Sequence, residues 1–227
     1  MDDTLTKDME NTKEAFKLVL NYINEEYNEE KFLKFYNIDK QTWRERAAGI
    51  LKTPYEDDKE KKKEWIRARR FIKYFDGNVS YEKAVHMNNI YMEGMKEKVV
   101  PRENCFDVIK YLHEKGYRLI IATNGPTVPL EAKIEKLNIS NFIDMIFSAE
   151  EVGFMKPHKT YYEGLLKKAD LTNFDNVLFI GDDLDKDVKG ALENNIDICW
   201  CNYENEINEK YALTYEIKEL IELKKIL

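Results

Sequence analysis

Beyond residue 101, short apolar runs alternate with amphipathic stretches, and this alternation restricts the fold more than any other feature of the sequence. The expected strands are residues 117–123, 143–148, 176–181 and 196–200. The expected helices are residues 103–115, 130–137, 159–168, 184–194 and 215–225. Strands separated by helices form right-handed βαβ units and a parallel sheet. The sequence therefore predicts an α/β fold built on a Rossmann-like parallel sheet.

Residues 11–98 differ from the rest of the chain, because their apolar positions fall at helical spacing. One helix is marked by Phe16, Val19, Leu20, Ile23 and Tyr27, at i, i+3, i+4, i+7 and i+11. Further helices are expected at residues 41–51, 59–75 and 81–96. The sequence therefore predicts an inserted helical bundle. Residues 1–9 and 100–227 are expected to form the α/β core, and residues 10–99 the insertion.

The balance of charge and hydrophobicity limits the partners of the chain. Its 227 residues carry a net charge of −7, which argues against binding to a nucleic-acid polymer or an anionic membrane. No apolar run approaches the roughly 18 residues that span a bilayer, and no signal-peptide pattern is found, so a cytoplasmic protein is expected. The three cysteines have no CxxC spacing, which predicts reduced, structural thiols. A small phosphorylated metabolite remains a suitable partner, and a monomer or homodimer is expected.

An acidic loop follows the apolar run at residues 176–180. Its aspartates are Asp182, Asp183, Asp185 and Asp187. So many carboxylates in one loop repel one another unless a cation or water screens them. Magnesium prefers a few carboxylates together with water and phosphate oxygens, so the loop is a candidate metal site. The alternative is a solvated, acid-rich helix N-terminus, where the helix dipole favours aspartate.

Two further polar segments lie where a ligand of a parallel sheet is expected, beyond the strands. Thr123 ends an expected strand and is followed by Asn124 and Gly125, and a hydroxyl with free main-chain amides can bind phosphoryl oxygens there. An ordinary Asn-Gly turn is the alternative. Lys156 lies just before an expected helix, where its ammonium group can offset the charge of a carboxylate and a phosphoryl group. One surface lysine among many is the alternative.

The N-terminus adds Asp2, Asp3 and Thr4 to these motifs. In chain order the motifs are an acid-Thr segment, a strand followed by Thr-Asn-Gly, a Lys-Pro pair before a helix, and a strand followed by Gly-Asp-Asp-x-x-x-Asp. This order resembles the haloacid dehalogenase-like (HAD) superfamily of hydrolases. The resemblance covers essentially the whole chain, with the helical insertion in the place of that superfamily's cap.

The resemblance implies a role for each motif. In that superfamily one aspartate attacks phosphorus to form an aspartyl-phosphate, and a second protonates the leaving alcohol and then activates water. Asp2 matches the second, the catalytic acid/base, and its main-chain carbonyl would be a metal ligand. Thr123 and Asn124 match phosphate-binding positions, and Lys156 matches the lysine that balances charge and binds phosphate.

The same resemblance implies a Mg²⁺ site. Asp182 matches the magnesium ligand, and Asp187 matches its second acidic partner, acting directly or through water. Asp183 and Asp185 match variable positions of the motif, so no role is assigned to them.

The attacking aspartate is placed by the resemblance directly before Met1, outside the sequence as written. It would end the first strand of the superfamily's sheet, which lies between the strands that match residues 117–123 and 176–181. Each backbone group buried without a partner costs about 1–3 kcal/mol, so a sheet with this first strand missing is expected to be much less stable. We therefore expect the gene product to begin upstream of Met1, which the upstream DNA sequence tests.

The type of hydrolysis follows from the same motifs. Asp2 and the acidic loop favour phosphate esters over 2-haloacid dehalogenation, which in this superfamily needs neither metal nor leaving-group protonation. The Thr-Asn-Gly segment and the approach to Lys156 resemble the pyrimidine 5'-nucleotidase branch, which implies nucleoside 5'-monophosphates or another small phosphorylated metabolite as substrate. A pseudoenzyme that binds phosphate without turnover is the non-catalytic alternative. A response-regulator receiver is disfavoured, because its acidic pair precedes its Thr and Lys.

In capped members of the superfamily, the cap determines which substrate is accepted. The helical insertion contains an aromatic-basic stretch that either contacts a base or phosphate or forms the core and solvated face of a helix. Its members are Trp65, Arg67, Arg69, Arg70, Phe71 and Tyr74.

Overall fold

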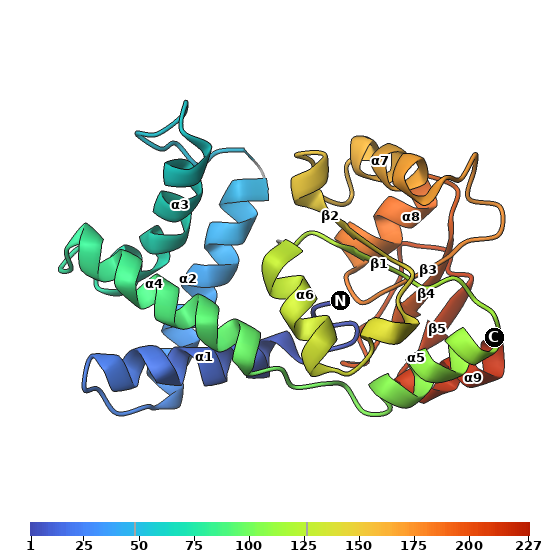
Figure 1. The fold of residues 1–227 in the computed structure, drawn as a ribbon, viewed down its shortest axis with the longest axis horizontal. Helices are drawn as coiled ribbons and strands as arrows, with labels where there is room; N and C mark the ends of the chain where they lie inside the picture. The colour runs from blue at the N-terminus through green and yellow to red at the C-terminus, as the bar shows by residue number, and fades with distance from the viewer. Residues whose placement is uncertain (48, 126) are drawn as a thin grey trace. The chain divides into compact units, whose positions relative to one another are not determined.

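The chain forms two compact units in the computed structural model, which describes residues 1–47, 49–125 and 127–227 (Figure 1). Met1–Asp8 and Val99–Leu227 form the first, called here the α/β unit. Met9–Lys98 forms the second, called here the helical unit. Among the described residues, no helix is both long and apolar enough to cross a membrane.

The described part of the α/β unit contains five short strands. They are β1 (Ile120–Thr123), β2 (Met145–Ser148), β3 (Leu178–Gly181), β4 (Asp197–Cys201) and β5 (Tyr215–Ile217). β1 pairs with β2, and β4 pairs with both β3 and β5; all three ladders are parallel. The prediction of an α/β fold with a parallel sheet is confirmed. Ladder pairing places β1 and β3, the strands expected to flank a further strand, in different sheets.

Helices cover both faces of these strands. They are α5 (Cys105–Glu114), α6 (Thr127–Lys136), α7 (Lys159–Ala169), α8 (Lys189–Glu193) and α9 (Leu223–Ile226). α5 and α9 lie on one side of the strands, and α7 and α8 lie on the other (Figure 1). A π-helical turn at Leu184–Val188 leads into α8. Short 3-10 turns occur at Ser140–Phe142, Ala149–Glu151 and Leu220–Glu222.

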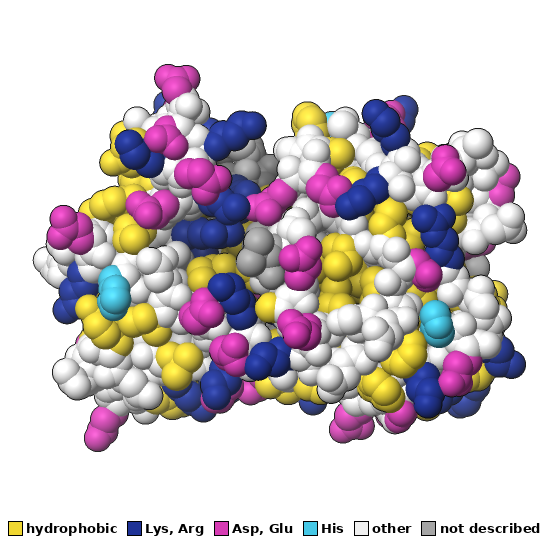
Figure 2. Space-filling model, viewed as in Figure 1, with side chains coloured by type: hydrophobic (Ala, Val, Ile, Leu, Met, Phe, Trp, Pro, Cys, Tyr) yellow, Lys and Arg dark blue, Asp and Glu magenta, His cyan; other side chains and the backbone are white. Residues whose placement is uncertain are grey.

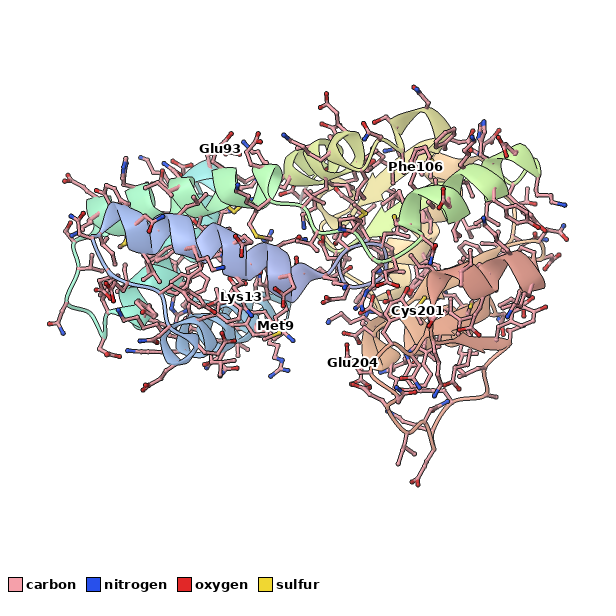
Figure 3. The ribbon with its side chains drawn as sticks, turned by 90° about the horizontal axis from the view of Figure 1, so that it is seen from below. Met9, Lys13, Glu93, Phe106, Cys201 and Glu204 are labelled. Carbon is pink, nitrogen blue, oxygen red and sulfur yellow. The ribbon has the colours of Figure 1, made fainter. Side chains whose placement is uncertain are left out.

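β4 shows why helices are needed on both faces. Cys199 and Cys201 pack into the hydrophobic cluster that contains α5 and α9 side chains, whereas Ile198 and Trp200 pack into the cluster that contains α7 side chains. Successive strand residues point to opposite faces, so a strand covered on both sides must be apolar throughout. Burial of one large apolar side chain contributes about 1.5–3 kcal/mol. The cysteines are free and buried, as predicted, and Figure 3 shows Cys201 within the α/β unit.

The segment at residues 215–225 was predicted as a helix, and this prediction is wrong for its first part. Tyr215–Ile217 forms β5 because the free edge of β4 offers backbone groups that need partners. Only Leu223–Ile226 is α-helical. β1, β2 and β3 are also shorter than predicted, and β1 begins at Ile120 because the Leu119 N–H donates to the Asp144 side chain instead of a ladder partner.

The described part of the helical unit contains four helices, which confirms the predicted bundle. They are α1 (Asp8–Tyr22), α2 (Glu29–Ala47), α3 (Lys59–Tyr74) and α4 (Tyr81–Glu97). Aromatic rings fill its core, and the rings of Phe16 and Phe35 stack with centroids 4.4 Å apart. α2 begins at Glu29 rather than at the predicted residue 41, because Phe32 and Phe35 already bury their side chains in this core.

Part of the aromatic-basic stretch of α3 packs inside the helical unit. The Arg70 guanidinium pairs with the Asp39 carboxylate at 2.5 Å, and both side chains are buried. Phe71 and Tyr74 belong to the hydrophobic core. These contacts favour a packing role, rather than contact with a base or phosphate, for Arg70, Phe71 and Tyr74. On the molecular surface, Figure 2 shows acidic and basic side chains interspersed over the visible face.

Candidate active site

The predicted site residues of the α/β unit follow the carboxyl ends of two strands. β1 ends at Thr123, and β3 ends at Gly181, directly before Asp182. Lys156 precedes α7, and its Nζ donates to the Ala122 carbonyl oxygen of β1 at 3.4 Å. The structure therefore brings Lys156 to the edge of the sheet where ligands of α/β proteins bind.

Two polar side-chain atoms lie close to Gly125, just beyond β1. Thr123 Oγ1 accepts a hydrogen bond from the Gly125 N–H at 3.0 Å. A Cβ atom placed on Gly125 would lie 3.3 Å from Thr123 Oγ1 and 3.4 Å from Asp2 Oδ2. The buried Tyr161 hydroxyl donates to the Thr123 carbonyl oxygen at 3.2 Å and steadies this turn. A hydroxyl and a carboxylate therefore lie close to the same turn.

The Asn124 side chain joins two loops. Its Oδ1 accepts from the Lys156 N–H at 2.7 Å, and its Nδ2 donates to the Lys156 carbonyl oxygen at 3.1 Å. This reciprocal pair fixes the backbone of Lys156 relative to the Thr123 turn. A phosphate ligand from Asn124 would have to be its main-chain N–H or the second hydrogen of Nδ2, and that role stays a prediction.

Lys156 and Asp187 form a buried ion pair. Lys156 Nζ lies 2.6 Å from Asp187 Oδ1, and Asp187 Oδ2 accepts from the Asp183 N–H at 3.2 Å. Burial by itself raises the pKa of Asp187, but the Lys156 ammonium group outweighs it and holds that pKa below its usual range. Asp187 is therefore ionised, and each of its oxygens already has a protein donor.

Asp182 is held by neutral groups. The Thr4 hydroxyl donates to Asp182 Oδ1 at 2.6 Å, and the Trp200 indole N–H donates to the Asp182 carbonyl oxygen at 2.9 Å. Burial and then the negative charge of Asp187 raise the pKa of Asp182 to about 6. Two carboxylates so close together provide the negative charge that a hard divalent cation prefers.

The other two aspartates of the acidic loop serve its local structure. Asp183 Oδ1 accepts from the N–H groups of Asp185 and Lys186 and so caps the π-helical turn, while Asp185 is exposed. Asp187 reaches the site because Gly181 has no side chain: a Cβ there would lie 2.5 Å from Asp187 Cβ. The loop therefore directs two of its four carboxylates inward.

A second buried lysine reaches Asp2, and the sequence analysis missed it. Lys133 of α6 lies 2.5 Å from Asp2 Oδ1 and 3.5 Å from Asp8 Oδ1. Burial alone raises the pKa of Asp2, but the Lys133 ammonium group leaves it below its usual value. The signal was available in principle, because Lys133 lies on the same helix face as the buried Leu130 and Leu137.

The segment that carries Asp2 is fixed by backbone contacts with residues beyond the helical insertion. The Lys7 N–H donates to the Val100 carbonyl oxygen, and the Arg102 N–H donates to the Leu5 carbonyl oxygen, both at 2.9 Å. The Tyr203 hydroxyl also donates to the Thr4 carbonyl oxygen at 2.8 Å. These bonds hold Asp2 and Thr4 at the edge formed by β1 and β3, although both lie far from these strands in the sequence.

The residues present fit a Mg²⁺ ion that takes part of its coordination from water and phosphate. No cluster of three or more acidic, His or Cys side chains suited to a metal occurs among the described residues. The donor set that the family resemblance implies is the Asp182 carboxylate, the Asp2 main-chain carbonyl and Asp187, directly or through water, and this assignment stays a prediction. Magnesium commonly binds to one or two carboxylates with substrate oxygens completing its shell.

A family model for haloacid dehalogenase-like hydrolases matches residues 1–194 of the chain. Together with the parallel strands, the acidic loop after β3 and the helical insertion, this match defines the class of protein. The chain belongs to the haloacid dehalogenase-like hydrolase family.

Two curated relatives illustrate the match. The HAD-hydrolase YfnB of Bacillus subtilis is 32% identical over 126 residues, which cover 55% of this chain and 53% of YfnB. The pyrimidine 5'-nucleotidase YjjG of Escherichia coli is 25% identical over 142 residues, which cover 62% of this chain and 63% of YjjG. The chain thus spans between about half and two thirds of the length of these relatives.

Solved structures share the fold over the full chain. A crystal structure of YfnB bound to magnesium has a TM-score of 0.83 at 24% identity and covers 100% of this chain and 95% of that one. The L-2-haloacid dehalogenase of Xanthobacter autotrophicus, with chloropropionic acid covalently bound, has a TM-score of 0.71 at 13% identity and covers 99% and 94%. At these identities the likeness establishes the fold alone.

Proposed function

We propose that this chain is a phosphate monoester hydrolase that uses Mg²⁺ and an aspartyl-phosphate intermediate. Its expected substrates are nucleoside 5'-monophosphates or another small phosphorylated metabolite, as the name of its relative YjjG suggests. In this proposal residues 10–99 serve as the cap that selects the substrate. The protein is expected to work in the cytoplasm as a monomer or homodimer.

The observation that carries the proposal is that Thr123 Oγ1 and Asp2 Oδ2 both lie beside Gly125, 3.3 and 3.4 Å from the point where a Cβ would lie. A hydroxyl suits a phosphoryl oxygen, and a carboxylate beside it suits proton transfer to or from the ester oxygen. A site that only binds phosphate gains nothing from a carboxylate facing the anion. Asp2 therefore favours hydrolysis over simple binding.

Hydrolysis would proceed in two steps. In the first, a carboxylate oxygen of the attacking aspartate bonds to phosphorus, the ester oxygen leaves phosphorus, and Asp2, in its protonated form, gives that oxygen a proton. In the second, Asp2 takes a proton from water, the water oxygen bonds to phosphorus, and the aspartyl oxygen leaves, which releases inorganic phosphate. Thr123 holds a phosphoryl oxygen throughout, and Lys156 offsets negative charge next to Asp187.

Mg²⁺ would be held by Asp182, by the Asp2 main-chain carbonyl and by Asp187, directly or through water. When bound, the ion neutralises charge on the phosphoryl oxygens. The Thr4 hydroxyl orients the Asp182 carboxylate, and Trp200 fixes the Asp182 backbone.

The test is phosphate release from p-nitrophenyl phosphate and a panel of nucleoside 5'-monophosphates, with Mg²⁺ and with excess EDTA. Because the family pattern places the attacking aspartate directly before Met1, two forms are compared: the 227 residues as written and the chain extended by its upstream codons. We expect Mg²⁺-dependent release by the extended form. Asp182→Asn should slow it by about 100-fold or more, since a metal supplies several kcal/mol, whereas the exposed Asp185→Asn should match the wild type.

Other outcomes distinguish the alternatives. Phosphate binding without hydrolysis in both forms would favour a non-catalytic, phosphate-binding pseudoenzyme. Chloride release from 2-chloropropionate, without phosphate release, would favour a 2-haloacid dehalogenase. Hydrolysis that persists in EDTA would refute the metal-dependent mechanism.

A further inference from the structure

Lys133 is a buried charge that none of the family motifs includes. It lies on α6, its side chain is 5% exposed, and its Nζ contacts the carboxylates of Asp2 and Asp8. A buried ammonium group costs free energy unless it is paired, so a lysine at this position needs a reason beyond packing. Neighbouring positions on the same helix face are apolar, namely Leu130 and Leu137.

We propose that Lys133 is a positioning residue that orients the Asp2 carboxylate toward the phosphate-binding turn. The inference rests on the proposed function, in which Asp2 is the acid/base. Lys133 acts through Asp2 and has no contact with substrate in this proposal.

The two oxygens of Asp2 have different surroundings, and this difference supports the proposal. Oδ1 is held by Lys133 Nζ at 2.5 Å. Oδ2 lies beside Gly125, 3.4 Å from the point where a Cβ would lie. With one oxygen tied and the other directed at the turn, the carboxylate cannot rotate freely about its terminal bond. Lys133 therefore selects which oxygen meets the ester.

Lys133 also balances charge at the turn. An ionised Asp2 beside Thr123 repels a phosphate dianion, and a cation on the far side of the carboxylate reduces that repulsion. α6 starts directly after the turn, so the same helix that follows the phosphate-binding segment supplies this cation. Asp8 lies 3.5 Å from Lys133 Nζ and is the more distant of the two partners.

A merely structural lysine is the competing explanation, and a double-mutant cycle separates the two. The full chain is titrated with inorganic phosphate in the presence of Mg²⁺, by calorimetry. We expect Lys133→Met to weaken phosphate binding about tenfold and Lys133→Arg, which keeps the charge, to restore most of it. In an Asp2→Asn background, Lys133→Met should change the affinity less than about twofold, because residues that act as a unit are not additive. Lys136→Met, exposed on the same helix, is the matched control.

Turnover gives a second measurement, in which a purely structural role of Lys133 would not distinguish between two esters. In whichever form hydrolyses esters, Lys133→Met should lower kcat more for a nucleoside 5'-monophosphate than for p-nitrophenyl phosphate. The reason is orientation: p-nitrophenolate leaves without protonation, whereas a sugar alkoxide needs the proton of Asp2, and without Lys133 the Asp2 carboxyl group is no longer held toward the ester oxygen. If Lys133→Met does not fold, Asp8→Asn and Lys133→Arg are measured in its place. Asp8→Asn is expected to keep wild-type affinity, because it leaves the contact with Asp2 in place.

The outcomes distinguish this inference from the proposed function. Wild-type affinity in Lys133→Met, equal losses in both Asp2 backgrounds, or the same kcat loss on both esters would overturn the role of Lys133 alone. If only Asp8→Asn and Lys133→Arg can be measured, weakened phosphate binding by Asp8→Asn would also overturn the role of Lys133. Failure of the wild type to bind phosphate with Mg²⁺ and to release it from esters would overturn the proposed function, and the inference with it.

Discussion

At the scale of single residues, the site is a set of buried and half-buried charges that differ in their partners. Lys156 neutralises Asp187, and Lys133 neutralises Asp2. Asp182 is held instead by the neutral hydroxyl of Thr4, and its pKa is raised from 3.8 to about 6 by burial and by Asp187. A carboxyl group whose pKa is raised by folding destabilises the folded state at neutral pH. Such shifted pKa values are common at functional sites.

We predict that Asp182→Asn stabilises the metal-free protein at neutral pH. Below about pH 4, Asp182 is protonated in both the folded and the unfolded chain, so the substitution has no effect through its charge. Between about pH 4 and 6 the folded state binds more protons, so stability falls as the pH rises, and above 6 the full cost remains. Thermal unfolding in EDTA should therefore show a higher Tm for the variant at pH 7–8, with the difference shrinking towards pH 4.

Asp185→Asn is the control for this prediction, because Asp185 lies in the same loop with an exposed side chain. It should leave the pH dependence of Tm unchanged. An Asp182→Asn variant no more stable than the wild type at pH 8 would contradict the assigned cause of the raised pKa.

At the scale of elements, α2 and α3 are joined by both apolar and charged contacts. Phe35 and Phe71 pack with ring centroids 5.2 Å apart, and Arg70 of α3 pairs with Asp39 of α2. Arg70 also lies over the Tyr91 ring of α4 at 5.0 Å. The ion pair therefore lies inside the bundle, where removing one partner leaves the other charged and buried.

We predict that Asp39→Ala destabilises the chain by about 3–5 kcal/mol, the usual cost of breaking a buried ion pair. Lys34→Ala is the matched control, because Lys34 of α2 pairs with Asp76 at the surface, at 2.9 Å. An exposed pair contributes about 0–1 kcal/mol, so this control should stay close to the wild type. Urea unfolding followed by circular dichroism measures both, and equal effects would show that the Arg70 pair is solvated.

At the scale of the whole molecule, the site depends on segments that are far apart in the sequence. Met1–Asp8 supplies Asp2 and Thr4, and the remainder of the α/β unit supplies β1, α6 and β3. The helical unit is inserted between these two stretches of chain. A ligand held by several of these segments at once favours the folded state.

We predict that Mg²⁺ and inorganic phosphate together raise Tm. At 100 times the dissociation constant, a ligand of the folded state stabilises it by about 2.7 kcal/mol. That corresponds to roughly 5–10 °C for a chain of this size. Differential scanning fluorimetry should show this shift for the wild type, and EDTA or Asp182→Asn should remove it. A shift of equal size in EDTA would argue for a phosphate site independent of the metal.

Much of the architecture could be predicted from local pattern. The strands β1 to β4 and the long helices follow from apolar periodicity. Thr123 and Asp182 were predicted as site residues from their positions at and after strand ends, and Lys156 from its position before a helix. Tyr215–Ile217 could not be, because its strand conformation depends on the edge of β4, 14 or more residues away in the chain. The contacts of Asp183 and Asp187 were also set only in three dimensions, where one caps a turn and the other lies against Gly181.

The sequence by itself determined the family resemblance, the α/β pattern, the helical insertion and the residues expected to bind metal and phosphate, because spacing and residue type are local properties. Tertiary structure alone decided which charges are paired. It joined Asn124 to the Lys156 backbone, Lys156 to Asp187, and Lys133 to Asp2. Such contacts join positions up to 131 residues apart, and burial sets their strength, so they exist only once the chain has folded.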